Sequence, residues 1–296
     1  MNSLAVIVPA VNTLGDLIDC LAALDRERAS AELEVIVVNR LGEPSNAAIR
    51  TEAPWARIRS VPATTTIPQM RALAFREAKS EAIAVIEDHV IVPPGWAKRL
   101  LVGLAEGHAV VGGAVDNAAT GTLLDWAAFL CEYSHCLPPL PAGDVEWLTG
   151  NNVAYRRSVV EKHLPLLESG KWENALHDAL RAEGVALWCD PELIIGHKKH
   201  YTFWEYFSQR YLYARSYAGA RVAGAGAAKR LAMGAAALAL PPVLFARTVR
   251  RILAKGTHTG KLWPSLPLIA LFVLAWGWGE TVGYWLGAGD SLAKVK

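Results

Sequence analysis

Short runs of valine, isoleucine, leucine and alanine alternate with segments of helical periodicity in the front of this chain, and this alternation constrains the fold most. Strand-like runs stand at 4–10, 33–38, 56–61, 82–87 and 109–115. Residues 13–26 and 68–79 carry apolar side chains at helical spacing. Strands that are apolar on both faces belong to parallel sheets covered by helices. We therefore expect an α/β domain with a mostly parallel sheet sandwiched by helices.

The fourth run ends in three polar residues, Glu87, Asp88 and His89. Parallel sheets collect their ligands at the carboxyl ends of the strands, and these side chains stand at such an end. Two carboxylates and an imidazole can bind a divalent metal, but the same residues also suit the cap of a loop. The residues alone leave both interpretations open. No GxGxxG follows the first strand, which argues against a classical dinucleotide-binding fold.

Charge is unevenly distributed along the 296 residues. Residues 1–197 hold 16 Lys and Arg against 25 Asp and Glu, whereas residues 198–262 hold 12 Lys and Arg against the single Glu205. A basic stretch of this kind binds nucleic acid or an anionic membrane surface. Its cations flank uncharged apolar segments of membrane length, so we expect a membrane partner and no nucleic acid.

The four cysteines contain no CxxC pair and are expected to be reduced, buried thiols of a cytosolic domain. The N-terminal residues MNSLAVIVPA lack the basic region and long apolar core of a signal peptide. We therefore expect the front domain to lie in the cytoplasm, at the inner face of the cytoplasmic membrane.

The composition changes near residue 200, and we expect two further regions beyond it. Residues 201–228 mix aromatic residues with arginines and are expected to form an amphipathic helix at the membrane surface. A soluble helix packed on the sheet is the alternative. Residues 229–296 are expected to be the membrane-associated region.

Two apolar segments lie in this last region. Residues 231–246 are short for a crossing and contain the helix-breaking pair Pro241-Pro242, whereas 263–287 is long enough to span. The basic loop between them prefers the cytoplasmic side, as does the front domain, so we favour a re-entrant course over a spanning one for the first segment. Glu280 is expected to face protein, water or a lipid headgroup.

Several sequence signatures occur in a fixed order along the chain. They are AVIVPAVN, LEVIVVN, QMRALAFREAKSEAIAVIEDHVIVPPGW, VVGGAV, GNNVAYRR and WENALHDALRAEGVALWCDPELIIGH. Together they resemble the family 2 glycosyltransferases with the GT-A fold, and the tail is similar to the membrane-associated branch of that family. The resemblance covers residues 4 to about 200 and implies a GT-A-like domain over residues 1–200.

The resemblance implies a divalent cation, Mg²⁺ or Mn²⁺, that neutralises the charge of a departing diphosphate. Asp88 is expected to be its leading ligand, with His89 in place of the family's usual second acid. His197 matches a family histidine close to the metal or diphosphate, and Glu87 is expected to bind the metal or the ribose. Imidazole is a softer ligand than carboxylate, which shifts the preference toward Mn²⁺.

The resemblance also places residues near the nucleotide-sugar donor. These are Pro9, Ala10, Asn12, Asn39, Arg71, Asn151, Asn152, Gln209 and Arg210. Asn39 stands where an aspartate is common, which leaves the nucleotide unidentified. Gln209 and Arg210 match a glutamine–arginine–tryptophan motif of processive enzymes loosely and without its tryptophan, so we infer no processivity.

Sugar transfer to a hydroxyl needs a base. The family carries an acidic residue early in the helix before an L…R..G pattern, which corresponds to Glu173 here, with Asp178 as the substitute. Glu173 and His177 are spaced i, i+4 and share a helix face.

The expected function is an inverting, metal-dependent glycosyltransferase that moves a sugar from a nucleotide-sugar to a membrane lipid or polyprenyl-phosphate acceptor. The alternative is a degenerate module that binds nucleotide-sugars without turnover, since His89, Asn39 and Trp172 replace usually acidic residues. The sequence does not predict an oligomeric state.

Overall fold

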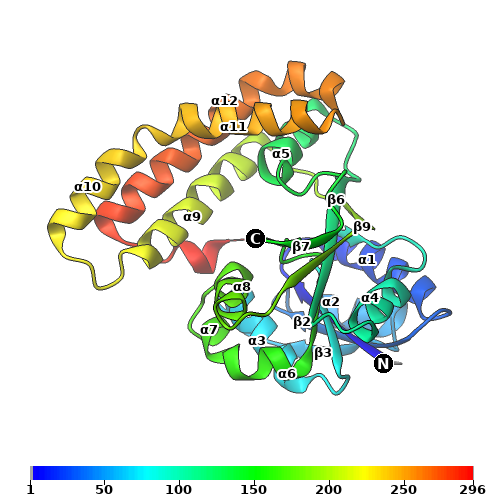
Figure 1. Cartoon of the computed structure of the whole chain (residues 1–296). Coiled ribbons are helices and arrows are strands. Elements are labelled where there is room, and N and C mark those ends of the chain that lie inside the picture. The colour runs from blue at the N-terminus through cyan, green and yellow to red at the C-terminus, as the bar shows by residue number, and fades with distance from the viewer. Residues whose placement is uncertain (1–2, 296) are drawn as a thin grey trace. The chain divides into compact units, whose positions relative to one another are not determined.

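The computed structural model describes residues 3–295, which divide into two compact units (Figure 1). Unit 1 comprises residues up to 118 together with 138–198. Unit 2 comprises 119–137 and the chain from 199 onward. The sequence interpretation of a continuous front domain over 1–200 did not anticipate that 119–137 would belong to the second unit.

Unit 1 is built on one nine-stranded sheet with the order β3-β2-β1-β4-β8-β6-β9-β5, and β7 pairs with β9. Its strands are β1 Ser3–Ala10, β2 Glu32–Asn39, β3 Arg57–Ser60, β4 Ala82–Val85, β5 Val90–Ile91, β6 Val110–Asn117, β7 Gly143–Val145, β8 Val153–Arg156 and β9 Leu187–His197. All five expected strand-like runs are thereby confirmed as strands.

The sheet is mixed rather than mostly parallel. The first four expected strands, β1 to β4, are parallel to one another where they pair. Strand β8 runs antiparallel to both of its neighbours, β4 and β6, while β5 and β7 run antiparallel to β9. An apolar run reports burial on both faces but not the direction of the strand, so the sequence pattern could not distinguish these pairings.

The helices of unit 1 are α1 Leu14–Glu27, α2 Glu43–Glu52, α3 Ile67–Glu77, α4 Trp96–Ala105, α6 Arg157–Val160, α7 Leu164–Glu168 and α8 Glu173–Ala182, with a short 3₁₀ turn at Glu161–His163. The expected helices over 13–26 and 68–79 correspond to α1 and α3. Local chemistry sets their starts: Thr13 caps α1 by accepting the Asp16 N–H at 3.1 Å, and Thr66 begins α3 in a capping box with Gln69.

Unit 2 is helical. It contains α5 Leu123–Tyr133, α9 Phe203–Arg221, α10 Ala227–Ala237, α11 Leu240–Lys255 and α12 Thr259–Leu286, followed by a 3₁₀ turn at Ser291–Lys294. The four cysteines of the two units are unpaired and buried, as expected.

Helix α9 packs along α12 through small residues. A side chain at Gly279 would overlap the Tyr211 carbonyl, and one at Gly283 would approach the Arg215 carbonyl at 2.6 Å and the Ala218 side chain at 2.7 Å. Glycines four residues apart allow two helix backbones to approach closely, as they do in membrane helix pairs. Helix α9, which falls in the segment expected at a membrane surface, is therefore partly covered by α12.

Helix α12 is long and apolar enough to cross a membrane, by length and composition. Helices α10 and α11 pass the same test only as a pair, bent by 51°. The bend precedes Pro241 and Pro242, which occupy the first turn of α11, where proline is tolerated. Glu280 is buried and accepts the Trp276 indole N–H at 2.9 Å. Of the three expected surroundings, protein, water and a lipid headgroup, it therefore faces protein.

Candidate active site

The ends of three strands, β1, β4 and β9, meet at one edge of the unit 1 sheet. The loop after β4 carries Glu87 to His89, and the adjacent β1 ends at Ala10. The short strand β5 follows His89 directly and pairs with the end of β9, so that Val90 lies opposite His197. The pairing register thus brings His89 and His197 together although 108 residues separate them.

Glu87, His89 and His197 form a compact group of side-chain atoms that could bind a metal ion. The Nε2 atoms of the two histidines lie 2.8 Å apart, and Glu87 Oε2 lies 3.4 Å from His89 Nε2 and 3.7 Å from His197 Nε2. Neighbouring ligands of a metal with bonds near 2.1 Å stand about 3 Å apart. The three side chains therefore fit a divalent cation in which two nitrogens and one carboxylate oxygen occupy one side.

Asp88 lies beside this group, and other partners engage both of its carboxylate oxygens. Its Oδ2 accepts the backbone N–H groups of Val11 at 2.7 Å and Asn12 at 2.8 Å, and its Oδ1 accepts the Asn12 side-chain amide at 2.7 Å. Because Asp88 is fully buried and both oxygens are engaged, the geometry favours Glu87 as the carboxylate ligand in place of the expected Asp88.

Asp88 instead contacts one of the two histidines of this group. His89 Nδ1 lies 2.9 Å from Asp88 Oδ1. A proton on Nδ1 would be donated to this carboxylate, which leaves Nε2 to face the metal group. The side-chain amide of Asn12, which was expected near the donor, donates to Asp88 Oδ1 and lies 3.1 Å from His89 Nδ1.

Buried charges govern the ionisation of the group. Burial lowers the pKa of His89, but hydrogen bonds to Asp88 and Glu87 outweigh it and raise the pKa to about 9. Burial raises the pKa of Glu87, yet its contacts with His89 and His197 hold it well below the ordinary value. The metal-free site is therefore expected to carry a proton on His89 at neutral pH, which a cation must displace.

A buried arginine joins this group to a second carboxylate. Arg71 of α3 is 2% exposed and forms an ion pair with Glu173 of α8, while its Nη2 lies 4.0 Å from Glu87 Oε1. Glu173 is 4% exposed, and its Oε1 has no hydrogen-bond partner within residues 3–295. A buried carboxylate with one unengaged oxygen is chemically suited to accept a proton from a substrate.

The two candidate bases, Glu173 and Asp178, lie on different faces of α8. Glu173, His177 and the apolar residues of α8 are buried, whereas Asp178 is exposed on the other side of the helix. The geometry therefore favours Glu173 over its substitute. His177 Nε2 lies 2.7 Å from the Tyr155 hydroxyl, and burial lowers the His177 pKa to about 4. Sequence reasoning missed Tyr155, although it stands inside GNNVAYRR.

Comparison with known proteins assigns the family. The model of the family described as "Glycosyl transferase family 2" matches residues 5–164, more than half of the chain. The chain belongs to glycosyl transferase family 2. It is a glycosyltransferase, as its sequence signatures implied. No curated protein matches the sequence.

Two solved structures share the fold of this glycosyltransferase. The mannosyltransferase PcManGT from Pyrobaculum calidifontis, in complex with GDP-Man and Mn²⁺, is 16% identical with a TM-score of 0.53, over 91% of this chain and 73% of that one. TarS residues 1–349 from S. aureus are 14% identical with a TM-score of 0.50, over 73% of this chain and 64% of that one. At these identities the likeness shows a GT-A-like fold alone.

Of the other residues expected to contact the nucleotide-sugar donor, some lie beside the site and some do not. Pro9 and Ala10 end β1 beside the site, and Asn151 donates to Glu87 Oε2 at 2.8 Å. Asn152 is fully buried elsewhere, donating to the carbonyls of Ala114 and Leu193 and accepting the Trp96 indole N–H. These bonds give Asn152 a structural role.

Asn39 is also engaged locally. Its amide donates to Ser45 Oγ at 2.7 Å and Asn46 Oδ1 at 2.6 Å, and its oxygen accepts the Leu41 N–H. The side chain therefore fixes the turn into α2 rather than presenting its amide to a base.

Gln209 and Arg210 lie on α9 of unit 2. Gln209 donates to the Lys294 carbonyl at 3.3 Å, and the Arg210 guanidinium lies over the Trp276 ring at 4.1 Å. Both side chains thus have partners inside the helical unit.

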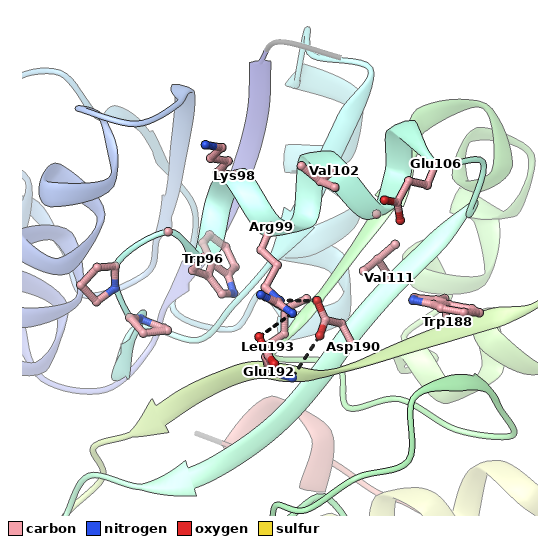
Figure 2. A pocket seen from close by; sticks show the side chains of 14 residues that line it. Trp96, Lys98, Arg99, Val102, Glu106, Val111, Trp188, Asp190, Glu192 and Leu193 are labelled. Atoms are coloured by element: carbon pink, nitrogen blue, oxygen red, sulfur yellow. Dashed lines mark hydrogen bonds and ion pairs between the residues drawn. The ribbon is translucent and has the colours of Figure 1, made fainter.

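A hollow of about 530 Å³ in unit 1 lies between α4 and the start of β9 (Figure 2). Arg99 pairs there with Asp190, and with Glu192 at 2.8 Å. The hollow adjoins the amino end of β9, whereas His197 stands at the carboxyl end, and its main charges neutralise one another. We assign it no part in the reaction.

Proposed function

We propose that this glycosyltransferase is metal-dependent and inverting, and that it transfers a sugar from a nucleotide-sugar to a lipid acceptor. The observation that carries the proposal is the pairing, through Arg71, of a three-atom metal group with the buried carboxylate of Glu173. One half of this arrangement suits a departing diphosphate, and the other suits an incoming hydroxyl.

Each residue has a distinct task in the proposed reaction. Glu87, His89 and His197 would hold Mg²⁺ or Mn²⁺, which neutralises charge on the leaving group. The acceptor oxygen forms the bond to the anomeric carbon, the bond to the diphosphate breaks with its electron pair on oxygen, and Glu173 Oε1 takes the hydroxyl proton. Arg71 forms an ion pair with Glu173 and holds its carboxylate in place.

The arrangement favours inversion over retention. Retaining catalysis by two carboxylates needs a nucleophile and an acid–base group, both acting at the sugar. Asp88 is engaged by backbone N–H groups, and Glu87 belongs to the proposed metal group. Glu173 alone is left as the base, which supports a single displacement. GDP-Man and Mn²⁺ in the PcManGT complex further support a nucleotide-sugar donor with a metal.

Features of unit 2 support a membrane-borne acceptor. Trp263 and Trp285 are exposed near the two ends of α12, about 33 Å apart at the helical rise of 1.5 Å per residue, which is close to the thickness of the hydrocarbon core. A hollow of about 540 Å³ between α9, the α10–α11 bend and α12 is lined by exposed Leu238, Leu274 and Trp278. Such a surface suits an alkyl or polyprenyl chain.

Some arginines of the basic stretch, which was expected at the membrane surface, have partners within unit 2. Arg215 donates to the Gly287 carbonyl at 3.2 Å, and Arg221 donates to the Tyr284 hydroxyl at 3.0 Å. Together with the stacked Arg210, these side chains support the helical unit itself. We therefore rest the lipid acceptor on the apolar hollow and the length of α12, and place the enzyme at the cytoplasmic face because its basic loop favours that side.

The test uses the full chain purified in detergent with a panel of nucleotide-sugars and lipid acceptors. Transfer or donor hydrolysis should require Mn²⁺ or Mg²⁺ and disappear with chelator. Glu173→Gln should lower kcat at least 100-fold with a hydroxyl acceptor, because it removes the base, whereas Glu168→Gln on the surface should not. Donor binding without turnover for any donor would instead support the degenerate binding module.

A further inference from the structure

A hollow of about 470 Å³ in unit 2 lies where two helices begin. Leu123, the first residue of α5, and Trp126 line it from one side. His258, Gly260 and Lys261, from the start of α12, line it from the other. The hollow lies within unit 2 and shares no residue with the metal group or with Glu173.

The start of α12 offers donors without acceptors. The first N–H groups of a helix have no intrahelical partner, and at α12 these include the groups of Thr259 and Gly260. The N-cap residue His258 supplies no side-chain hydrogen bond to them. The positive end of a helix of 28 residues therefore lies open beside the hollow.

Lys261 adds a full positive charge to this end. Its ammonium lies 5.5 Å from the centre of the Trp126 ring. Across the described chain, Lys261 forms no ion pair with a carboxylate. The sequence has no Asp or Glu between Glu205 and Glu280, so an acid from the same segment cannot neutralise it.

Trp126 provides an independent indication of a ligand. The side chain is 7% exposed and lines the hollow, yet its indole Nε1–H has no acceptor among residues 3–295. A buried donor without an acceptor costs free energy unless another molecule supplies one. An anion with several acceptor oxygens meets the needs of the indole, the helix start and the ammonium together.

The apolar part of the wall identifies the kind of anion. Leu123 is 44% exposed, Pro264 also lines the hollow, and the neighbouring Trp263 is 59% exposed. An exposed tryptophan at the end of a helix of spanning length is typical of the membrane interface, where phosphate headgroups lie. We propose that this hollow binds the phosphate group of an anionic membrane lipid.

The test measures lipid binding by the full chain in detergent, by native mass spectrometry without donor or metal. The probes are dioctanoyl phosphatidic acid, dioctanoyl phosphatidylcholine and inorganic phosphate. Phosphatidic acid should bind at least tenfold more tightly than the other two. Equal binding of phosphatidylcholine, or inorganic phosphate competing as tightly as phosphatidic acid, would overturn the assignment to an anionic lipid.

Two variants test the site itself. Lys261→Ala should weaken phosphatidic acid binding at least tenfold, since it removes the ammonium. Gly260→Asp should abolish binding by placing a carboxylate at the helix start, where a new Cβ meets nothing within 4 Å. The same change should keep or raise the Tm, because an acid in the first turn and the loss of a glycine both favour the helix.

The matched control is Lys229→Ala. Lys229 is the third residue of α10, as Lys261 is of α12, and it is exposed, but it lines none of the three hollows described above. Its replacement should leave binding unchanged. Equal losses in Lys229→Ala and Lys261→Ala would show a diffuse charge effect, and unchanged binding in Gly260→Asp would refute the site. Because the readout needs no turnover, these outcomes are independent of the proposed transferase reaction.

Discussion

Histidine at position 89 distinguishes this candidate metal site from the acidic pattern that the family signature implies. Two imidazoles and one carboxylate are softer than a set of carboxylates and favour Mn²⁺ over Mg²⁺. Restoring an acid with His89→Asp should therefore raise the ratio of Mg²⁺-supported to Mn²⁺-supported activity, by about tenfold. Both metals are measured on the same preparation, so the ratio corrects for any loss of folded enzyme. An unchanged ratio would show that position 89 does not bind the metal.

The ionisation of His89 should make the proposed metal binding depend on pH. Its pKa is raised to about 9, so below that value the cation competes with a proton on the imidazole. Mn²⁺ affinity should rise between pH 7 and pH 9, by up to about tenfold per unit, and level off above pH 9. Titration calorimetry at several pH values measures it. Affinity that is flat over this range would contradict the proposed role of His89.

At the scale of residues, the sequence could not decide which carboxylate, Asp88 or Glu87, faces the site. The sequence located the acidic cluster at a strand end, and that location is correct. It could not say which carboxylate faces the site, because the chain turns there: the Val90 N–H bonds to the Glu87 carbonyl at 3.1 Å. The turn directs Asp88 toward the first loop, whose backbone N–H groups have no sequence signature.

At the scale of elements, the packing of α9 on α12 depends on glycine. Gly283→Leu should destabilise unit 2 by about 2 kcal/mol, because the new side chain meets the Arg215 carbonyl and Ala218. The expected readout is a lower Tm in detergent. Gly226→Ala is the control, since a Cβ there meets nothing within 4 Å. Equal Tm values for the two variants would show that close approach at Gly283 is not needed.

Elements were predictable where periodicity reports burial. The strand-like runs and the helices α1 and α3 follow from it, as does the interruption near Pro241. The antiparallel insertion of β8 does not, because Val153 to Tyr155 read as any buried strand. The inclusion of 119–137 in unit 2 was equally hidden, since an apolar helix such as α5 gives no sign of which partner covers it.

At the scale of the whole molecule, residues 227–255 can follow one of two courses. The bent pair α10–α11 is compatible with a broken span or with a re-entrant loop. Cations prefer the cytoplasmic side, and Arg247, Arg250, Arg251 and Lys255 stand at the far end of this pair. We therefore predict that the pair is re-entrant and returns the chain to the side of unit 1.

Cysteine labelling in sealed vesicles tests this prediction. The four native cysteines are buried and should react slowly with an impermeant maleimide. Glu52→Cys on the surface of unit 1 and Ala254→Cys near the end of α11 are both exposed positions. If the pair is re-entrant, the two introduced cysteines lie on the same side of the membrane. They should then either both label in sealed vesicles or both label only after permeabilisation. Labelling of Ala254→Cys from the opposite side would mean that α10 and α11 cross the membrane and leave the basic loop outside.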